Sequence, residues 1–308
     1  MSIEESVDDD DESRFQSAFR HAPTGMALCT PHGDIEEANE ALGRLLGRNA
    51  DDLLGTSLFE VTHDDDLRAA HAACAQMRRA ETYFTRQSVR LKHADGSTVH
   101  VVVSTSRVDD RHGVVRRYVM HVEDVTDRIA LEGALQHQAL HDPLTGLPNR
   151  ALFVRRLTDV ASAATTGATR VGVLFVDLDR FKAINDNYGH AVGDSVLVAV
   201  ARRLSTLLRP GDTVARFGGD EFLLLCQNVG IAEVTRIAER ITAAIEDDIT
   251  VGTLRLPVTA SIGVAVRGQA DNPPEWLIRE ADMAMYRAKA EGRARIQTFS
   301  PDMGGDPS

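Results

Sequence analysis

The sequence predicts an α+β protein with two domains joined by a helix, and three observations support this prediction. With 308 residues, 43% of them hydrophobic, the chain is long enough to form two separate cores. The first half contains three successive strand patterns with hairpin signals between them. The second half alternates strand and helix patterns in the order β-α-β-β-α-β, and the helical pattern that links the two halves meets no proline before Pro143.

Charge and cysteine content exclude several classes of protein. The formal net charge of −12 argues against nucleic acid as a partner. Part of this charge lies in residues 1–12, an acidic leader that we expect to be disordered. Three cysteines without a CxxC pair indicate a reducing compartment rather than disulfides or a zinc site. No apolar run reaches the length of a membrane span and no signal peptide is present, so we expect a cytoplasmic protein without membrane contact.

Residues 13–124 predict the first domain. The pattern indicates a strand over 26–29 and helices over 39–46 and 67–79, the second preceded by three aspartates (64–66) that favour its N-terminus. Three strands follow, over 84–91, 97–107 and 114–125, with turns at 94–96 and 112–113. These elements predict a curved antiparallel sheet with small helices on one face.

This half of the chain resembles a PAS domain. The resemblance is carried by the stretches THDDD (62–66), KHADGS (92–97) and HVEDVTDR (121–128). It implies a sensory or dimerising role, but it does not name a signal. The NCRFLQ-type stretch of flavin-adduct light sensors is absent. A histidine could ligate haem, although a surface or core role is commoner for each of the five candidates, and the PAS ligand is left unknown: His63, His71, His93, His100 and His121.

Residues 125–140 predict a helical connector. Residues 124–127 (DVTD) offer helix-start chemistry, and Ile129, Leu131, Ala134 and Leu135 follow with a partly apolar helical spacing. The helix either pairs with its copy in a second chain as a short coiled coil or packs on its own protomer, and the spacing favours neither. In PAS-linked signalling enzymes such connectors are usually dimeric, so the resemblance implies a homodimer through the PAS domain and this helix.

Residues 141–300 predict the second domain, followed by a short tail (301–308). Asn149 is a candidate cap for a helix that ends near 164, and a nearly continuous apolar strand (170–175) ends at Asp177. Helices are expected over 181–187, 194–208, 233–245 and 274–290, with a hairpin over 214–225 and strands over 258–266 and 296–299. This order predicts a ferredoxin-like, palm-type core with a helical layer on one face of an antiparallel sheet.

The hairpin RFGGDEFLLL (216–225) places two carboxylates at its tip. Gly218 and Gly219 turn the chain, and Asp220 and Glu221 follow directly. Like charges so close are costly unless a cation shares them, although a solvated turn fits these ten residues equally well. The predicted topology brings Asp177 and Asp179 to the same end of the sheet. Oxygen ligands without cysteine or histidine suit Mg²⁺ or Mn²⁺, usually together with substrate phosphates.

Three basic residues are candidates for those phosphates. Lys182 follows the first aspartate pair, and Lys289 and Arg293 stand near the end of the last helix. Each alone is more often a solvated surface charge. Beside a cluster of carboxylates, they indicate a nucleoside triphosphate site.

The second half resembles a GGDEF-domain diguanylate cyclase over residues 139–300. The motifs are HDPLTGLPNR (141–150), VDLDRFKAINDNYGHAVGD (176–194), RFGGDEF (216–222), SIGVA (261–265) and ADMAMYRAKAEGRARI (281–296). The resemblance implies a metal-dependent enzyme that condenses two GTP into cyclic di-GMP with release of two pyrophosphates. Because the product is two-fold symmetric, a homodimer is the natural catalyst.

The resemblance also implies residue roles. Asp177 and Asp220 would bind Mg²⁺ (or Mn²⁺) with the Leu178 carbonyl, and Glu221 would assist at the metal or at the attacking 3′-hydroxyl. Asn185 and Asp194 would recognise guanine, because a carboxylate suits the donors at N1 and N2; adenine-accepting relatives have serine at the second position. The remaining substrate-binding positions would be Phe181, Lys182, Gly218, Gly219, Lys289 and Arg293.

A second motif, Arg209-Pro210-Gly211-Asp212, lies five residues before Gly218. From the residues alone, an arginine at a helix C-terminus followed by Pro-Gly is equally well explained as a helix stop. In the GGDEF family this RxxD is the product-inhibition site, and Arg240 matches a further arginine used there.

Two alternative functions remain. One is a catalytically silent cyclic di-GMP receptor that uses Arg209, Asp212 and Arg240, and the other is a different phosphoryl-transfer enzyme on the same core.

Overall fold

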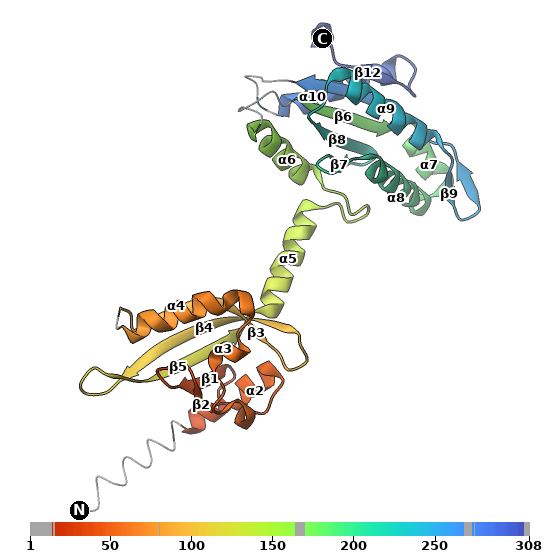
Figure 1. The fold of residues 1–308 in the computed structure, drawn as a ribbon. Helices are drawn as coiled ribbons and strands as arrows, with labels where there is room; N and C mark the ends of the chain where they lie inside the picture. Colours follow the sequence, from red (N-terminus) through yellow and green to blue (C-terminus); the bar gives the residue numbers. More distant parts are fainter. Residues whose placement is uncertain are drawn as a thin grey trace, which may run out of the picture. The chain divides into compact units, whose positions relative to one another are not determined.

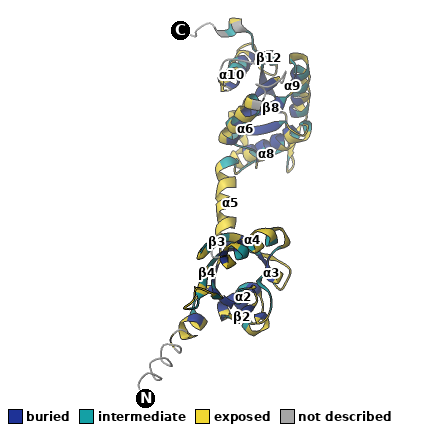
Figure 2. Cartoon of the chain, turned by 60° about the vertical axis from the view of Figure 1, so that its left-hand side comes forward, coloured by how far each residue is buried: buried dark blue, intermediate teal, exposed yellow. Residues whose placement is uncertain are grey.

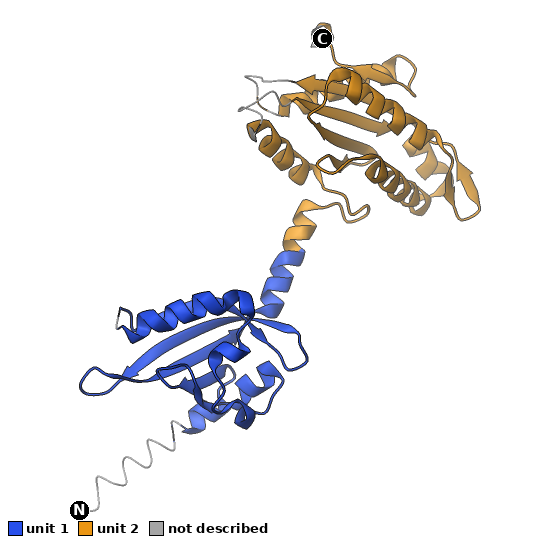
Figure 3. Cartoon of the chain, in the orientation of Figure 1, with its two compact units in different colours: residues 1–134 blue, residues 135–308 orange. Residues whose placement is uncertain are grey.

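The computed structural model describes residue 14 and residues 16–79, 81–163, 170–267, 273 and 275–304. The chain divides into two compact units, residues 1–134 and 135–308, and each is treated by itself (Figure 3). The predicted acidic leader lies outside the described residues, as does the end of the tail. Among the described residues, no helix combines the length and apolar character needed to cross a bilayer.

The first unit is built on a five-stranded antiparallel sheet in the order β2-β1-β5-β4-β3 (Figure 1). Small helices pack on the face whose core contains Leu46, Met77 and Met120. The antiparallel sheet with small helices on this face is as predicted, and Phe19, from the helical residues 16–21, packs against Met26 and Leu28 on the opposite face. The elements are β1 (Gly25–Cys29), β2 (Ile35–Ala38), α2 (Glu40–Leu46), α3 (Leu58–Val61), α4 (Leu67–Arg78), β3 (Phe84–Lys92), β4 (Thr98–Asp109) and β5 (Val115–Asp124).

The aspartates before α4 also connect the helix to the sheet. Residues Asp64–Asp66 form a 3₁₀ turn, and the side chain of Asp66 makes no capping hydrogen bond to α4. Its carboxylate instead accepts hydrogen bonds from Arg90 Nη2 at 2.8 Å and Nε at 3.0 Å, and Arg90 holds the pKa of Asp66 at about 2. Asp66 therefore ties the start of α4 to strand β3, while the three aspartates stand at the helix N-terminus as predicted.

The connector is the single helix α5 (Thr126–Leu140). It begins where the sequence predicts, with the Thr126 amide donating to Asp124 Oδ1 at 2.8 Å. None of its residues is buried, and Figure 2 shows it exposed along its length. Its apolar side chains are 43% (Ile129), 61% (Leu131) and 56% (Leu135) exposed.

The second unit contains a five-stranded sheet in the order β12-β11-β6-β8-β7. Its four antiparallel strands have the predicted ferredoxin-like order, and β12 adds a parallel strand beside β11. The elements are α6 (Arg150–Ala163), β6 (Val171–Leu178), α7 (Phe181–Tyr188), α8 (His190–Leu207), β7 (Thr213–Gly218), β8 (Glu221–Gln227), α9 (Ile231–Glu246), the hairpin β9 (Ile249–Val251) and β10 (Leu254–Leu256), β11 (Ala260–Arg267), α10 (Glu275–Ala290) and β12 (Ile296–Thr298).

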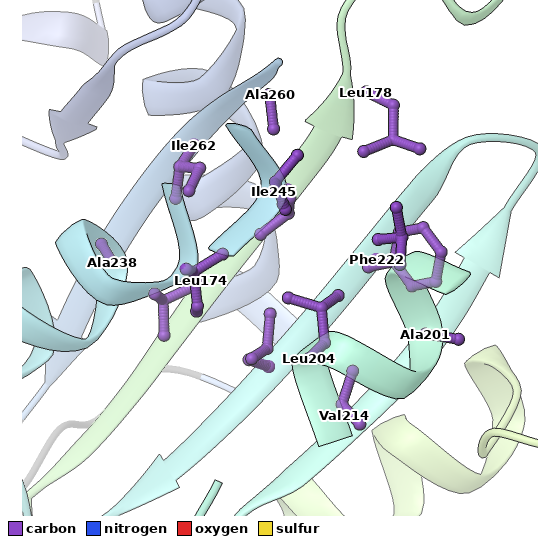
Figure 4. Close-up of a cluster of buried hydrophobic side chains, with 14 of the residues drawn as sticks. Leu174, Leu178, Ala201, Leu204, Val214, Phe222, Ala238, Ile245, Ala260 and Ile262 are labelled. Carbon is purple, nitrogen blue, oxygen red and sulfur yellow. The ribbon is translucent and has the colours of Figure 1, made fainter. Parts of the chain in front are cut away.

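Helices cover both faces of this sheet, not one as predicted. Along β6, Leu174, Val176 and Leu178 point into the core formed with α8 and α9 (Figure 4). Val173 and Phe175 point into a second core formed with α6 and α10. All eight residues of β6 are buried, which explains its continuous apolar sequence.

Helix α10 lies so close to β11 that Gly263 has no room for a side chain. A Cβ there would meet the Ala281 carbonyl oxygen at 1.9 Å and the Met285 amide nitrogen at 2.3 Å. Both are backbone atoms, so a larger residue must push the helix away from the sheet.

We expect Gly263→Ala to lower the free energy of unfolding by about 3 kcal/mol, because the added methyl overpacks the sheet–helix contact. Urea unfolding followed by fluorescence of Trp276, the chain's single tryptophan, measures this effect within α10. The matched control is Gly133→Ala in α5, where a Cβ meets nothing within 4 Å and should cost no stability. A Gly263→Ala protein as stable as the native chain would contradict the predicted crowding.

Candidate active site

The hairpin between β7 and β8 has a rigid, acidic tip. Gly219 adopts φ +49° at the turn, a conformation that glycine reaches without strain. Arg216 donates to the Gly219 carbonyl through Nε at 2.9 Å and Nη2 at 2.8 Å, and its Nη1 contacts Asp142 Oδ1 at 3.0 Å. The Asp220 carbonyl accepts the Leu178 amide at 3.3 Å. The backbone of the tip is therefore fixed without the carboxylates of Asp220 and Glu221.

Strand pairing sets two carboxylates against each other. In the β6–β8 ladder Asp177 lies directly opposite Glu221. Phe175, two residues before Asp177, and Leu223, two residues after Glu221, both enter the core on the α10 side. Side chains two residues apart in a strand share a face, so both carboxylates lie on that side of the sheet. Like charges in this relation destabilise a sheet.

The electrostatics of the pair confirm this cost. Burial, and then the charges of Asp177 and Asp220, raise the pKa of Glu221 above its ordinary value. The pKa of Asp177 is also raised, first by burial, with smaller contributions from Asp220 and Asp179, while Lys289 opposes the rise. The structure thus brings Asp177 and Glu221 together as predicted, with Asp220 close enough for its charge to raise the pKa of both, and the folded chain disfavours the charged forms of Asp177 and Glu221.

Helix α10 supplies the counter-charge. Lys289, expected at the phosphates, has its Nζ 2.6 Å from Asp177 Oδ2. Asp282 stands two helical turns earlier on the same face and contributes to the raised pKa of Glu221. The sequence reasoning missed Asp282, although its seven-residue spacing from Lys289 was available as a signal. It also missed the Asp142–Arg216 pair, whose members lie in two of the quoted motifs.

The donor set fits Mg²⁺ only in part. Within the described ranges, no three histidine, cysteine, aspartate or glutamate side chains are grouped as a metal centre. The protein offers carboxylates and, at the end of β6, the backbone carbonyl of Leu178, whose side chain is buried in the core. Mg²⁺ is commonly held by one or two carboxylates, with phosphate and water oxygens completing the shell. The residues present suit a metal that arrives with its substrate.

The candidate guanine-recognition residues lie at the contact of α7 and α8. Asn185 Oδ1 lies against Gly193, where a Cβ would be 1.9 Å away, and Asp194 follows on α8. The structure therefore places the Asn185 side chain next to the residue that precedes Asp194. Phe181 is only 8% exposed and belongs to the core, so little of its ring is left for a ligand.

The remaining predicted substrate contacts are open to solvent. Lys182 and Arg293 are exposed, and within the described part of the chain neither side chain has an ion pair. Gly218 and Gly219 border a cavity of about 690 Å³ together with Arg150 and Phe217, and the Arg150 guanidinium lies 4.6 Å from the Phe217 ring centre. This space has the size of a small-molecule pocket.

The three predicted product-site residues surround one pocket of about 300 Å³. Arg209 Nε lies 3.4 Å from Asp212 Oδ2, and Arg209 Nη1 lies 3.3 Å from Glu233. Arg240 Nη2 donates to the Leu207 carbonyl at 3.0 Å. Arg236, one turn before Arg240 on α9, lines the same pocket and was not singled out from the sequence.

The first unit holds a small apolar cavity of about 50 Å³, lined by residues that include Cys29, Cys74, Met77 and Met120. None of the five candidate histidines lines it, and His71 instead stacks on Phe59. The volume is far below the ~300–1,000 Å³ of pockets that enclose drug-sized ligands. A haem or flavin therefore does not fit this cavity as it stands.

The raised pKa of Glu221 gives a test of the site's electrostatics. Because folding disfavours the charged form, Glu221→Gln should raise the free energy of unfolding at neutral pH. This gain should fade as the pH falls from the raised pKa to the ordinary glutamate value. Below that value, Glu221 of the unmutated chain is protonated in both the folded and the unfolded state. Urea unfolding from about pH 4 to pH 8 measures it. A gain that grew toward acid pH would refute the assignment.

Two family profiles match the chain. The profile described as "Diguanylate cyclase, GGDEF domain" matches residues 139–295, just over half of the chain, and a PAS domain profile matches residues 23–127.

Curated relatives of this chain include diguanylate cyclases. The uncharacterized protein y4lL of Sinorhizobium fredii is 30% identical over 305 residues, which are 96% of this chain and 36% of that protein. Diguanylate cyclase TpbB of Pseudomonas aeruginosa is 44% identical over 162 residues (52% and 37%). Diguanylate cyclase DgcM of Escherichia coli is 38% identical over 205 residues (67% and 49%). The chain spans less than half the length of these three relatives.

Solved structures are similar to the second unit. The GGDEF domain of TpbB from Pseudomonas aeruginosa has a TM-score of 0.51 and 41% identity, covering 53% of this chain and 96% of that one. The coiled coil and GGDEF domain of DgcB from Caulobacter crescentus, in complex with c-di-GMP, has a TM-score of 0.52 and 28% identity, covering 56% and 91%. The chain thus belongs to the GGDEF family and carries a PAS domain before its GGDEF domain, as its motifs predicted.

Proposed function

We propose that this protein is a diguanylate cyclase, which condenses two GTP into cyclic di-GMP and two pyrophosphates. The observation that carries the proposal is the carboxylate edge, where Asp177 and Glu221 oppose each other on one face of the sheet with Asp220 at the adjoining turn. A fold does not retain mutually repelling, partly buried carboxylates for stability, so their use must lie in binding a cation with its substrate. Similarity to diguanylate cyclases TpbB and DgcM supports the reaction.

The chain's own residues bind and orient the nucleotide in this proposal. Asn185 and Asp194 recognise guanine, and the exposed cations Lys182 and Arg293 bind the β- and γ-phosphates, joined by Lys289 from beside Asp177. Phe181 contributes through its backbone amide at the start of α7, since its ring is buried. Gly218 and Gly219 leave space for the nucleotide against the hairpin.

Asp177, Asp220 and the Leu178 carbonyl would hold the metal, with Glu221 beside them. Mg²⁺ would supply charge neutralisation at the phosphates and a lower pKa for the attacking 3′-hydroxyl. Glu221 would assist at the metal or accept the proton of that hydroxyl. The remaining contribution of the protein is positioning, as in other phosphoryl transfers.

The reaction needs two copies of the chain. Each catalytic domain presents one GTP, and the 3′-hydroxyl of each nucleotide must face the α-phosphorus of the other. The exposed apolar side chains of α5, Ile129, Leu131 and Leu135, support pairing through the connector helix. In this arrangement the PAS domain regulates output by setting how often the two catalytic domains meet.

Product feedback is the second part of the proposal. Arg209, Asp212 and Arg240 border one pocket, and the two arginines offer donors to the phosphates of cyclic di-GMP. The DgcB structure was obtained with c-di-GMP, which shows that a similar protein binds this product. Product bound here would slow the enzyme that makes it.

We expect Asp220→Ala to reduce turnover at least about 100-fold, which corresponds to a loss of about 3 kcal/mol of transition-state stabilisation. The variant should fold, because the Asp220 carbonyl and not its carboxylate holds the turn. Chromatography of cyclic di-GMP formed from GTP and Mg²⁺ measures turnover, and Trp276 fluorescence checks folding. Asp248→Ala, which removes an exposed carboxylate before β9, is the matched control. Retained turnover in Asp220→Ala would contradict the metal assignment.

Arg209→Ala and Arg240→Ala should each raise the product concentration that half-inhibits turnover by about 10-fold, since each removes a charge-assisted hydrogen bond to a phosphate. Arg255→Ala, an exposed arginine on β10, is the control and should leave inhibition unchanged. Unaltered inhibition in both variants would exclude this pocket. If the native chain binds cyclic di-GMP here but forms none from GTP, the alternative function, a catalytically silent receptor, replaces the enzyme.

A further inference from the structure

Asp179 was expected to join the metal-binding carboxylates, but its side chain points into the protein. It directly follows β6 and is only 7% exposed. Its Oδ2 accepts hydrogen bonds from Thr259 Oγ1 at 2.8 Å and from the Ala294 amide at 3.0 Å, and its Oδ1 accepts one from Ser261 Oγ at 2.7 Å. A carboxylate committed to three internal donors is a poor candidate for a metal ligand.

These partners belong to separate segments of the second unit. Thr259 directly precedes β11 and Ser261 is its second residue, and the Asp179 amide also donates to the Thr259 carbonyl at 2.8 Å. Ala294 lies in the turn between α10 and β12. Asp179 therefore fastens the turn after α10 to the end of β6 and the start of β11.

That turn is strained where it carries Arg293. Arg293 and Ala294 have φ angles of +63° and +47°, which non-glycine residues adopt at a cost of about 1–3 kcal/mol each when the surroundings hold them there. The Arg293 amide donates to the Ala288 carbonyl at 3.0 Å on one side, and the Ala294 amide donates to Asp179 on the other. The Arg293 side chain remains exposed.

The turn after α10 faces the turn that opens α7. Arg180, which follows Asp179, also has a positive φ of +55°, and it lines a cavity of about 360 Å³ together with Gly292 and Arg293. Asp179 lines the same cavity. The buried carboxylate of Asp179 therefore lies between two turns. One turn carries Arg293, and the other leads to Lys182, two residues after Arg180.

We propose that Asp179 is a positioning residue for the triphosphate: its three hydrogen bonds hold the turn after α10 in the strained form that presents Arg293 to the β- and γ-phosphates. This inference rests on the proposed phosphate-binding role of Arg293. Asp179 acts through hydrogen-bond geometry, not through its charge and not as a metal ligand.

The distinction can be tested with the conservative variant. In Asp179→Asn, the amide oxygen keeps the bonds from Thr259 and Ala294, and the amide nitrogen donates to the Ser261 hydroxyl, which can also accept. In Asp179→Ala all three bonds are lost. Binding of α,β-methylene GTP with Mg²⁺ to the full chain, measured by calorimetry, is the readout, because this analogue cannot release pyrophosphate and the measurement is independent of turnover.

We expect Asp179→Asn to bind the analogue within about threefold of the native chain, and Asp179→Ala to bind about 10-fold more weakly. Arg293→Ala should weaken binding similarly, and adding Asp179→Ala to it should cause little further loss, because the group being positioned is already gone. With GTP, the Asp179→Ala effect should fall on KM more than on kcat.

Three results would overturn the proposal: equal losses in Asp179→Asn and Asp179→Ala, additive losses in the double variant, or no affinity of the native chain for the analogue. If Asp179→Ala does not fold, Thr259→Val removes one bond to the same oxygen and should give a smaller loss that likewise vanishes in the Arg293→Ala background. Thr213→Val, which removes a buried hydroxyl bonded to Arg156, is the control and should leave affinity unchanged. Turnover of the native chain with GTP separately decides the proposed function.

Discussion

The two-sided burial of strand β6 is the constraint on which the rest of the catalytic unit depends. Its alternate side chains enter two different cores. A shift of the strand register by one residue would therefore move the side chains of each core to the other face of the sheet. The register with β8 is therefore fixed over the whole strand, and with it the opposition of Asp177 and Glu221 at the end. The carboxylates repel each other, yet they cannot separate without disturbing two layers of packed helices. The geometry of the candidate site is a product of core packing.

Much of this architecture could be predicted from the sequence, because it follows from local patterns. The longer strands and helices, the glycine turn and the strand order of the second domain came from periodicity and turn chemistry. The short elements β2, α3, β9 and β10 were not predicted. The helical layers were misjudged, although the unbroken apolar run at 170–175 already indicated burial on both faces. What local patterns do not contain is the pairing of distant polar groups. Asp179 bonds to groups 80 to 115 positions away, and Lys289 reaches Asp177 across 112 positions.

The proposed regulation uses elements distinct from the carboxylate edge. Asp212 stands immediately before β7 and Gly218 at its end, so the product pocket and the acidic hairpin tip lie at opposite ends of one six-residue strand. At about 3.3 Å per residue, this separates them by roughly 20 Å. A product molecule in the pocket would not occupy the substrate's place, so the proposed feedback would act at a distance from the carboxylate edge. The exposed connector α5 is a separate element again, and in the proposed dimer pairing through it would set how the two catalytic domains meet.

The raised pKa values at the carboxylate edge have an evolutionary consequence. The charges that make the site useful weaken the fold that carries them, so selection for the proposed cyclic di-GMP synthesis would have to oppose their loss continually. Once that selection relaxes, neutral replacements at the hairpin tip are favoured by stability alone. In the pocket around Arg209, that arginine is paired with Asp212 and Glu233, so it carries no such liability and would outlast the active site. If the chain is such a cyclase, the loss of its active site would increase the stability of the fold. The result would be a chain that no longer makes cyclic di-GMP but can still bind it.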